Sequence, residues 1–255
     1  MNLREISELS WEQVRDLDRP RTVAILPLGS LEAHGPHLPL GTDTLIGVAM
    51  AQEGARRLAE RGVSALLLPA LPLAAAPFAE AFPGTLSISP GAFSALVADL
   101  AASLTSQGFG ALAIANAHLD PAHLGALAEA QRQAEARGAL PIACPHLTRR
   151  ALAERLTDEF RSGACHAGRF ESSIVMAVRP ELVHDEVRNS LPAVPASLSS
   201  AIRDGASTFA EAGGPRAYFG DPAAASAEEG RASIATLGEI LAEAALAALA
   251  RREAP

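Results

Sequence analysis

Short apolar runs alternate with long helical segments through the first 145 residues of the chain. Runs rich in Val, Ile, Leu and Ala and bounded by Gly or Pro predict buried strands at 22–28, 65–68, 111–115 and 140–144. Apolar residues at helical spacing predict helices at 44–60, from Pro90 to near Gly108, and at 121–137. Because parallel neighbours need a long crossover, this alternation predicts an α/β fold, a mostly parallel sheet with helices on both faces.

The pattern loosens after Pro145. Helices are expected at 148–160 and 170–178, followed by irregular chain up to Pro222 and a long Ala-rich helix at 227–251. Thr42 or Asp43 is the expected N-cap of the first helix. No internal repeat or long linker divides the sequence, so we expect a single domain over residues 1–255.

Composition excludes several classes of function. The net charge of −8 argues against nucleic acid or an anionic membrane as a partner. All 21 basic residues are Arg, so no lysine Schiff base or P-loop lysine is available. The first twenty residues lack an apolar run, and the stretch 235–250 is interrupted by glutamates, so we expect a cytoplasmic protein without a membrane span.

Carboxylate and imidazole side chains follow two of the predicted strands. Glu32, His34 and Asp43 come after the first strand, and His118 and Asp120 come directly after the third. In an open parallel sheet, ligands bind at the carboxyl ends of the strands, where loops lead into helices. We therefore expect these five side chains to converge at one edge of the sheet.

Two imidazoles and three carboxylates are too many ligands for one tetrahedral zinc ion, but they suit two divalent ions that share a carboxylate. Such a pair activates water and polarises a carbonyl, so the pattern predicts a hydrolase. Simpler roles remain open for two of the residues. Asp120 precedes Pro121 and could cap a helix, and Asp43 could complement the dipole of the helix that it begins.

A third polar segment places His166 just before a predicted helix and Glu171 in its first turn. A histidine and a glutamate are the types needed to transfer a proton to a departing amine. Alternatively, Glu171 only favours the helix dipole, or it is solvated together with Arg169. Four further residues are interpreted as supporting or idle: His37, His123, Cys144 and Cys165.

The segment from Leu26 to Asp43, LPLGSLEAHGPHLPLGTD, resembles the opening signature of the creatininase family, also called creatinine amidohydrolases. Four shorter segments are similar to later family motifs, in the same order: 82–87, 116–118, 166–171 and 220–230. The resemblance spans most of the chain. It implies a three-layer α/β/α domain, usually assembled as a homohexamer, with a dinuclear metal centre that hydrolyses an amide-type C–N bond.

The resemblance also implies a role for each site residue. Glu32 and His118 would hold one zinc, manganese or iron ion, His34 and Asp120 would hold the other, and Asp43 would bridge them. His166 would lie over the substrate, and Glu171 would support it or the metal shell.

The chain departs from the family pattern at several positions. Asp120 stands where creatininase has a longer Glu ligand, and Arg169 stands where an acidic residue is usual. The only tryptophan is Trp11, whereas creatininase surrounds its substrate with tryptophans. We therefore expect a small amide other than creatinine, a non-peptide such as a cyclic amide or a formamide, or else a modified peptide. Arg169 would suit a carboxylate or phosphate on it.

Two other functions remain open from the sequence. A dinuclear phosphoesterase is disfavoured because no Lys or Arg occurs in the loops at 29–42 and 116–122. A non-catalytic α/β assembly subunit that binds a metal or a small ligand is the second alternative.

Overall fold

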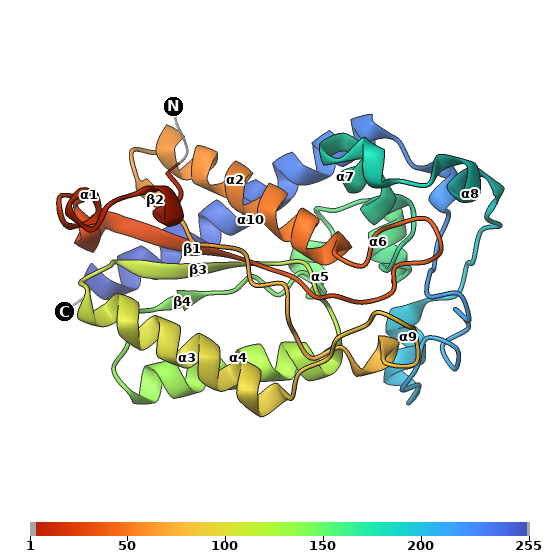
Figure 1. Cartoon of the computed structure of the whole chain (residues 1–255), viewed down its shortest axis with the longest axis horizontal. Coiled ribbons are helices and arrows are strands. Elements are labelled where there is room, and N and C mark those ends of the chain that lie inside the picture. The colour runs from red at the N-terminus through yellow and green to blue at the C-terminus, as the bar shows by residue number, and fades with distance from the viewer. Residues whose placement is uncertain (1–3, 254–255) are drawn as a thin grey trace.

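The computed structural model describes residues 4–253 and contains a central sheet of four parallel strands. The strands are β1 (Thr22–Leu28), β2 (Ser64–Leu67), β3 (Ala111–Asn116) and β4 (Ile142–Ala143), in the order β2-β1-β3-β4. Figure 1 shows α2 (Thr42–Glu60) and α10 (Ala227–Glu253) on one side of the sheet, and α3 (Pro90–Ser106) and α4 (Pro121–Ala136) on the other. The predicted three-layer α/β/α fold is confirmed.

Strand β1 explains why both faces of the sheet are covered. All seven of its residues are buried, and successive side chains point to opposite faces. Val23 and Ile25 join the core under α2 and α10, whereas Leu26 and Leu28 join the core under α3 and α4. A strand without a polar face has no side to leave in water, so helices must cover both.

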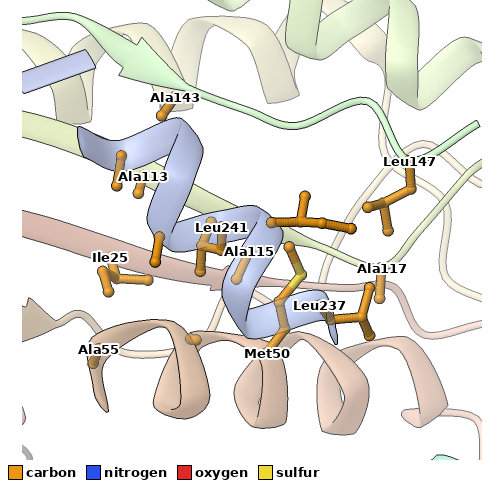
Figure 2. Packing of buried hydrophobic residues seen from close by; sticks show 14 of the residues in the cluster. Ile25, Met50, Ala55, Ala113, Ala115, Ala117, Ala143, Leu147, Leu237 and Leu241 are labelled. Carbon is orange, nitrogen blue, oxygen red and sulfur yellow. The ribbon is translucent and has the colours of Figure 1, made fainter. Parts of the chain in front are cut away.

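Small residues let α10 pack closely on the sheet and on α2. Figure 2 shows Ala113 and Ala115 of β3 close to α10, with Ala115 next to Leu241. At the crossing with α2, a Cβ added to Gly54 would lie 2.7 Å from the side chain of Leu241. The glycine therefore sets the close approach of the two helices. By length and composition α10 could also cross a membrane, but half of its most apolar window is buried inside the fold, where it serves as core.

The remaining helices are short and lie mostly beyond the carboxyl ends of the strands (Figure 1). They are α1 (Trp11–Arg15), α5 (Arg150–Ala153), α6 (Asp158–Ser162), α7 (Arg169–Val178), α8 (Asp185–Ser190) and α9 (Leu198–Arg203). Five single 3-10 turns occur at Ile6–Glu8, Arg19–Arg21, Pro77–Ala79, Pro180–Leu182 and Pro222–Ala224.

Three details differ from the sequence-based expectation. The helix expected at 148–160 is broken into α5 and α6, because the hydroxyl of Thr157 accepts from the N–H of Phe160 and starts a new helix there. Helix α2 begins at Thr42 with Gly41 as its N-cap, so neither Thr42 nor Asp43 is the cap. The Asp43 carboxylate instead contacts His34 and His118. The fourth strand is shorter than expected and contains only Ile142 and Ala143.

Candidate metal centre

The loops that follow β1 and β3 deliver buried polar side chains to one place. Glu32 and His34 come from the loop after β1, Asp43 lies in the first turn of α2, and His118 follows β3. Each of these four side chains is at most 3% exposed. They belong to three overlapping groups whose ligand atoms lie within 4.8 Å of one another: Glu32, Asp43 and His118; His34, Asp43 and Glu171; and Glu32, His34 and His166.

Asp43 lies between two histidines. Its Oδ1 is 3.2 Å from Nε2 of His34, and its Oδ2 is 3.0 Å from Nδ1 of His118. The hydroxyl of Ser30 donates to the same Oδ2 at 2.8 Å and fixes the carboxylate plane. Asp43 belongs both to the group with His118 and Glu32 and to the group with His34 and Glu171, and it contacts both histidines, which is what a bridging carboxylate needs.

Backbone carbonyls orient all three histidines of the centre. Nδ1 of His34 donates to the carbonyl of Glu32, and Nε2 of His118 donates to the carbonyl of Ala75 at 2.8 Å. Nε2 of His166 donates to the carbonyl of Ala33 at 2.9 Å. Each ring therefore turns its other nitrogen toward the carboxylates, as metal-binding histidines do when an outer hydrogen bond fixes their tautomer.

The Glu32 carboxylate provides a test of whether cations fit here. Its Oε1 lies 3.3 Å from Nδ1 of His118, but its buried Oε2 has no hydrogen-bond partner among residues 4–253. An ionised oxygen in that position costs free energy unless a cation or a proton compensates it. The oxygen and nitrogen donor set suits borderline divalent ions such as zinc, manganese or iron. The residues fit a metal centre.

The charges of the cluster shift its pKa values strongly. Burial lowers the pKa of His34, but the carboxylates of Asp43, Glu171 and Glu32 outweigh burial and raise it to about 10. Burial raises the pKa of Glu171 to about 8 despite the nearby His34. In Asp43, His34 and His118 outweigh the effect of burial and hold the pKa well below its usual range. Without metal, the cluster binds protons where cations would bind.

The comparisons with known proteins agree with this geometry. Residues 7–245 match the family model Creatininase, described as creatinine amidohydrolase. The chain belongs to the creatininase family. A curated relative, the mycofactocin precursor peptide peptidase of Mycobacterium tuberculosis, is 32% identical over 244 residues, which cover 91% of this chain and 88% of the relative.

Two creatinine amidohydrolases extend the comparison within the creatininase family. The enzyme of Pseudomonas putida is 29% identical over 121 residues, 45% of each chain. A crystal structure of creatinine amidohydrolase has a TM-score of 0.70 with this fold at 22% identity, covering 96% of this chain and 97% of its own. Because the sequence identity in the second comparison is low, that comparison supports the fold alone.

Six of the seven predicted site residues come together in this creatininase-family centre, and Asp120 lies beside it. The Asp120 carboxylate accepts from the N–H of Ala122 at 2.8 Å and from the N–H of Phe78 at 3.2 Å. It therefore caps α4, as one reading of the sequence proposed, and it belongs to none of the three ligand groups found among residues 4–253. The ligand roles of Glu32, His34, Asp43, His118 and Asp120, and the catalytic roles of His166 and Glu171, stay predictions.

Glu171 supports the loop that carries His166. Its Oε2 accepts from the N–H of Ala167 at 2.6 Å and lies 3.6 Å from Nε2 of His34. Ala167 has a φ of 50°, a left-handed conformation that is unfavourable for a residue with a Cβ. The hydrogen bond that Ala167 donates to Glu171 stabilises this turn. The ring of His166 is stacked on Phe209, with ring centroids 4.3 Å apart.

Asn116 and His123 contact His118 and support the turn that carries it. The amide of Asn116 donates to the His118 carbonyl at 2.7 Å and accepts from Nε2 of His123 at 3.0 Å. The His123 ring also packs 4.8 Å from the His118 ring. Asn116 and His118 lie in the segment 116–118 that resembles a family motif, and His123 has the supporting position that was one of the two roles expected of it.

Arg169 is not where the sequence suggested, whereas Cys165 agrees with the role expected for it. Arg169 forms an ion pair with Glu229 at 3.2 Å and does not line the cavity of the site, so it is not the group that meets an anionic substrate. Cys165 does line that cavity, but burial raises the pKa of its thiol to about 12. A thiol that stays protonated is a weak nucleophile, which agrees with the idle role expected for it.

Glu159 of α6 binds backbone N–H groups at the start of α7 and at Asp221. No pattern in the sequence indicated this role of Glu159. Its two oxygens accept from the N–H of Phe170 at 2.8 Å and from the N–H of Asp221 at 2.7 Å. The N-cap of α7 is Gly168, which has no side chain to cap the helix. Glu159 supplies that acceptor across space.

We expect the Glu159→Ala substitution to lower the free energy of unfolding by about 2 kcal/mol, because two N–H groups lose their acceptors. Urea unfolding measures the change. The control is Glu154→Ala, which removes an exposed carboxylate paired with Arg150 and should change stability by less than about 0.5 kcal/mol. Equal effects of the two substitutions would contradict the role of Glu159.

Proposed function

We propose that this creatininase-family member is a metal-dependent hydrolase that cleaves an amide-type C–N bond with two divalent ions. The observation that carries the proposal is the shared carboxylate of Asp43, which contacts both His34 and His118. Glu32 and His118 would complete one ion site, and His34 and Glu171 the other, with Asp120 beside it. Among structures of similar fold, one creatininase is described as a manganese form and another, a mutant, as a Zn-Zn type.

Divalent ions in this centre would supply Lewis acidity, which lowers the pKa of water and polarises a carbonyl. The chain's own residues handle the proton. Nε2 of His166 is committed to the Ala33 carbonyl, so Nδ1 is the atom that can hold a proton, and it lies 3.8 Å from Oε1 of Glu32. Burial, with the charge of His34, holds the pKa of His166 well below its usual range, so protonated His166 readily gives its proton to a departing nitrogen.

The substrate class is proposed from the relatives and the cavity. The cavity in front of the centre has a volume of about 590 Å³, which suits a ligand larger than a single small ring. A peptide or peptide-derived amide therefore replaces the non-peptide amide as our leading candidate, in line with the relative named a precursor peptide peptidase. A cytoplasmic location and a hexameric assembly stay predictions.

The test is hydrolysis by purified protein after chelation and after reloading with Mn²⁺, Zn²⁺ or Fe²⁺. The panel contains short peptides, formamides, lactams and cyclic ureas. We expect turnover of at least one peptide or amide that disappears with chelator, returns with metal and is absent in Glu32→Gln. Stoichiometric metal binding without turnover of any compound would instead support the non-catalytic assembly subunit.

A further inference from the structure

The cavity in front of the metal centre changes character from its floor to its rim. The floor is acidic and buried, and it includes Glu32, Asp43 and His118. The walls are apolar, with Phe78, Leu124, Leu198, Ile202 and Phe209 among them. The rim carries two exposed guanidinium groups, Arg149 and Arg203.

Neither rim arginine is paired with a carboxylate in the part of the chain that the structure describes. Most neighbouring arginines in the same part of the chain are paired: Arg150 with Glu154, Arg155 with Glu243 and Arg161 with Asp158. Within residues 4–253, Arg149 forms no ion pair, and Arg203 only donates to the hydroxyl of Ser200 at 2.9 Å. The cavity therefore has two cations on its rim whose charge is available to a ligand.

Local structure does not account for Arg149. It is the residue before α5, where a positive charge gains nothing from the helix dipole. Its charge reaches the cavity lining, because burial and then Arg149 lower the pKa of the lining residue His146. Arg203 ends α9, where the dipole does favour a cation, so the dipole explains only one of the two.

We infer that Arg149 and Arg203 bind a free carboxylate of the substrate. The substrate would then be an amide whose scissile bond lies at the metal centre, whose apolar segment fills the walls, and whose carboxylate reaches the rim. Guanidinium groups bind carboxylates through two parallel hydrogen bonds, and two of them define the position of the anion. The inference rests on the proposed function, because it places the scissile bond at the metals.

Electrostatics favours an anion at this end of the cavity. The floor carboxylates attract cations in the metal-free protein, but bound divalent ions would neutralise them. The rim charges then dominate the field that an incoming ligand meets. An anionic group is drawn to the rim, and a neutral or cationic one gains nothing there.

The inference can be tested without knowing the natural substrate. The probes are monohydroxamates of dicarboxylic acids from glutaric to sebacic acid, which carry a metal-binding group at one end and a carboxylate at the other. The matching methyl esters lack the charge, and matching phosphonates replace carboxylate by phosphoryl. Calorimetry gives the affinity of each for metal-loaded protein, and titration of the simple dicarboxylates into metal-free protein gives an arm that is independent of metal.

For one chain length we expect the acid to bind about tenfold more tightly than its ester, the size of one charge-assisted hydrogen bond. The preference should vanish in Arg149→Gln and in Arg203→Gln and shrink at high salt. Arg150→Gln is the matched control, because Arg150 is the next residue, is exposed and does not line the cavity. It should keep the full preference.

The outcomes separate this inference from the proposed function. Metal-dependent binding of acid and ester with equal affinity would overturn the rim assignment and leave the metal centre intact. Arginine-dependent binding of simple dicarboxylates without metal-dependent hydroxamate binding would support the rim assignment and overturn the proposed metal centre. A phosphonate preferred tenfold over the acid would overturn the choice of carboxylate, and no binding in either arm would overturn both proposals.

Discussion

The Asp43→Asn variant is expected to bind neither metal ion and to lose hydrolytic activity by about 1,000-fold or more. Asp43 offers one oxygen to the side of His34 and the other to the side of His118, so one substitution affects both sites. An amide is a weaker ligand than a carboxylate, and the substitution removes a negative charge that the two proposed cations would share. A loss of about 4 kcal/mol of transition-state stabilisation corresponds to the stated factor.

Elemental analysis of the purified variant, together with the rate on the best substrate found, measures both effects of the Asp43 substitution. Asp99→Asn is the matched control, because Asp99 is 74% exposed and pairs with Arg137 on the surface. Ser30→Ala is the graded control. It removes the hydroxyl that donates to Asp43 and should weaken metal binding by about 10-fold, the lower end for an outer partner. Two ions bound per Asp43→Asn chain would refute the bridging role.

The convergence of Glu32, His34, Asp43 and His118 could be predicted because it depends on topology alone. Each residue either follows the carboxyl end of β1 or β3 by a few positions or lies in the first turn of the helix after β1. The two strands are hydrogen-bonded neighbours. Once the sheet is parallel, the loops must meet at one edge. Local sequence was sufficient for this part of the site.

Contacts that depend on the packing of the later segments could not be predicted. Phe209 follows a stretch without regular pattern, and it stacks on His166 only because the chain after α9 folds back over the centre. Glu159 reaches Phe170 and Asp221 because the expected helix is broken at Thr157. Periodicity describes one element at a time, so it contains no information about such contacts.

Asp120 shows how one residue can satisfy two predictions that sequence cannot separate. Asp120 precedes Pro121, which is typical of a helix cap, and it also stands where the family resemblance implies a metal ligand. The structure realises the cap, and Glu171 instead lies in a ligand group with His34 and Asp43. Which carboxylate completes the second ion site is therefore a question for substitution.

We expect Glu171→Gln to bind one ion and Asp120→Asn to bind two. Glu171 Oε2 lies 3.6 Å from Nε2 of His34, whereas the Asp120 oxygens already accept two backbone N–H groups. Asp120→Asn should keep the cap, because Asn caps helices as well as Asp does, but it should lower the free energy of unfolding by about 1 kcal/mol because the N–H of Phe78 loses its acceptor. Metal content and urea unfolding of the two variants, which make the same carboxylate-to-amide change, give the comparison.

Protons released on metal binding provide an independent test of the same assignment. In the metal-free protein the pKa of His34 is raised to about 10 and that of Glu171 to about 8, so both groups are protonated at pH 7. Ligands must lose these protons to bind an ion, so affinity should increase with pH across this range. Calorimetry in buffers of different ionisation enthalpy should show two protons fewer released by Glu171→Gln than by the wild type, because the Glu171 proton is absent and His34 keeps its proton when the second ion does not bind. Asp120→Asn should show no decrease. The opposite result would restore Asp120 as the ligand that the family resemblance implies and leave Glu171 only the task of holding the His166 loop.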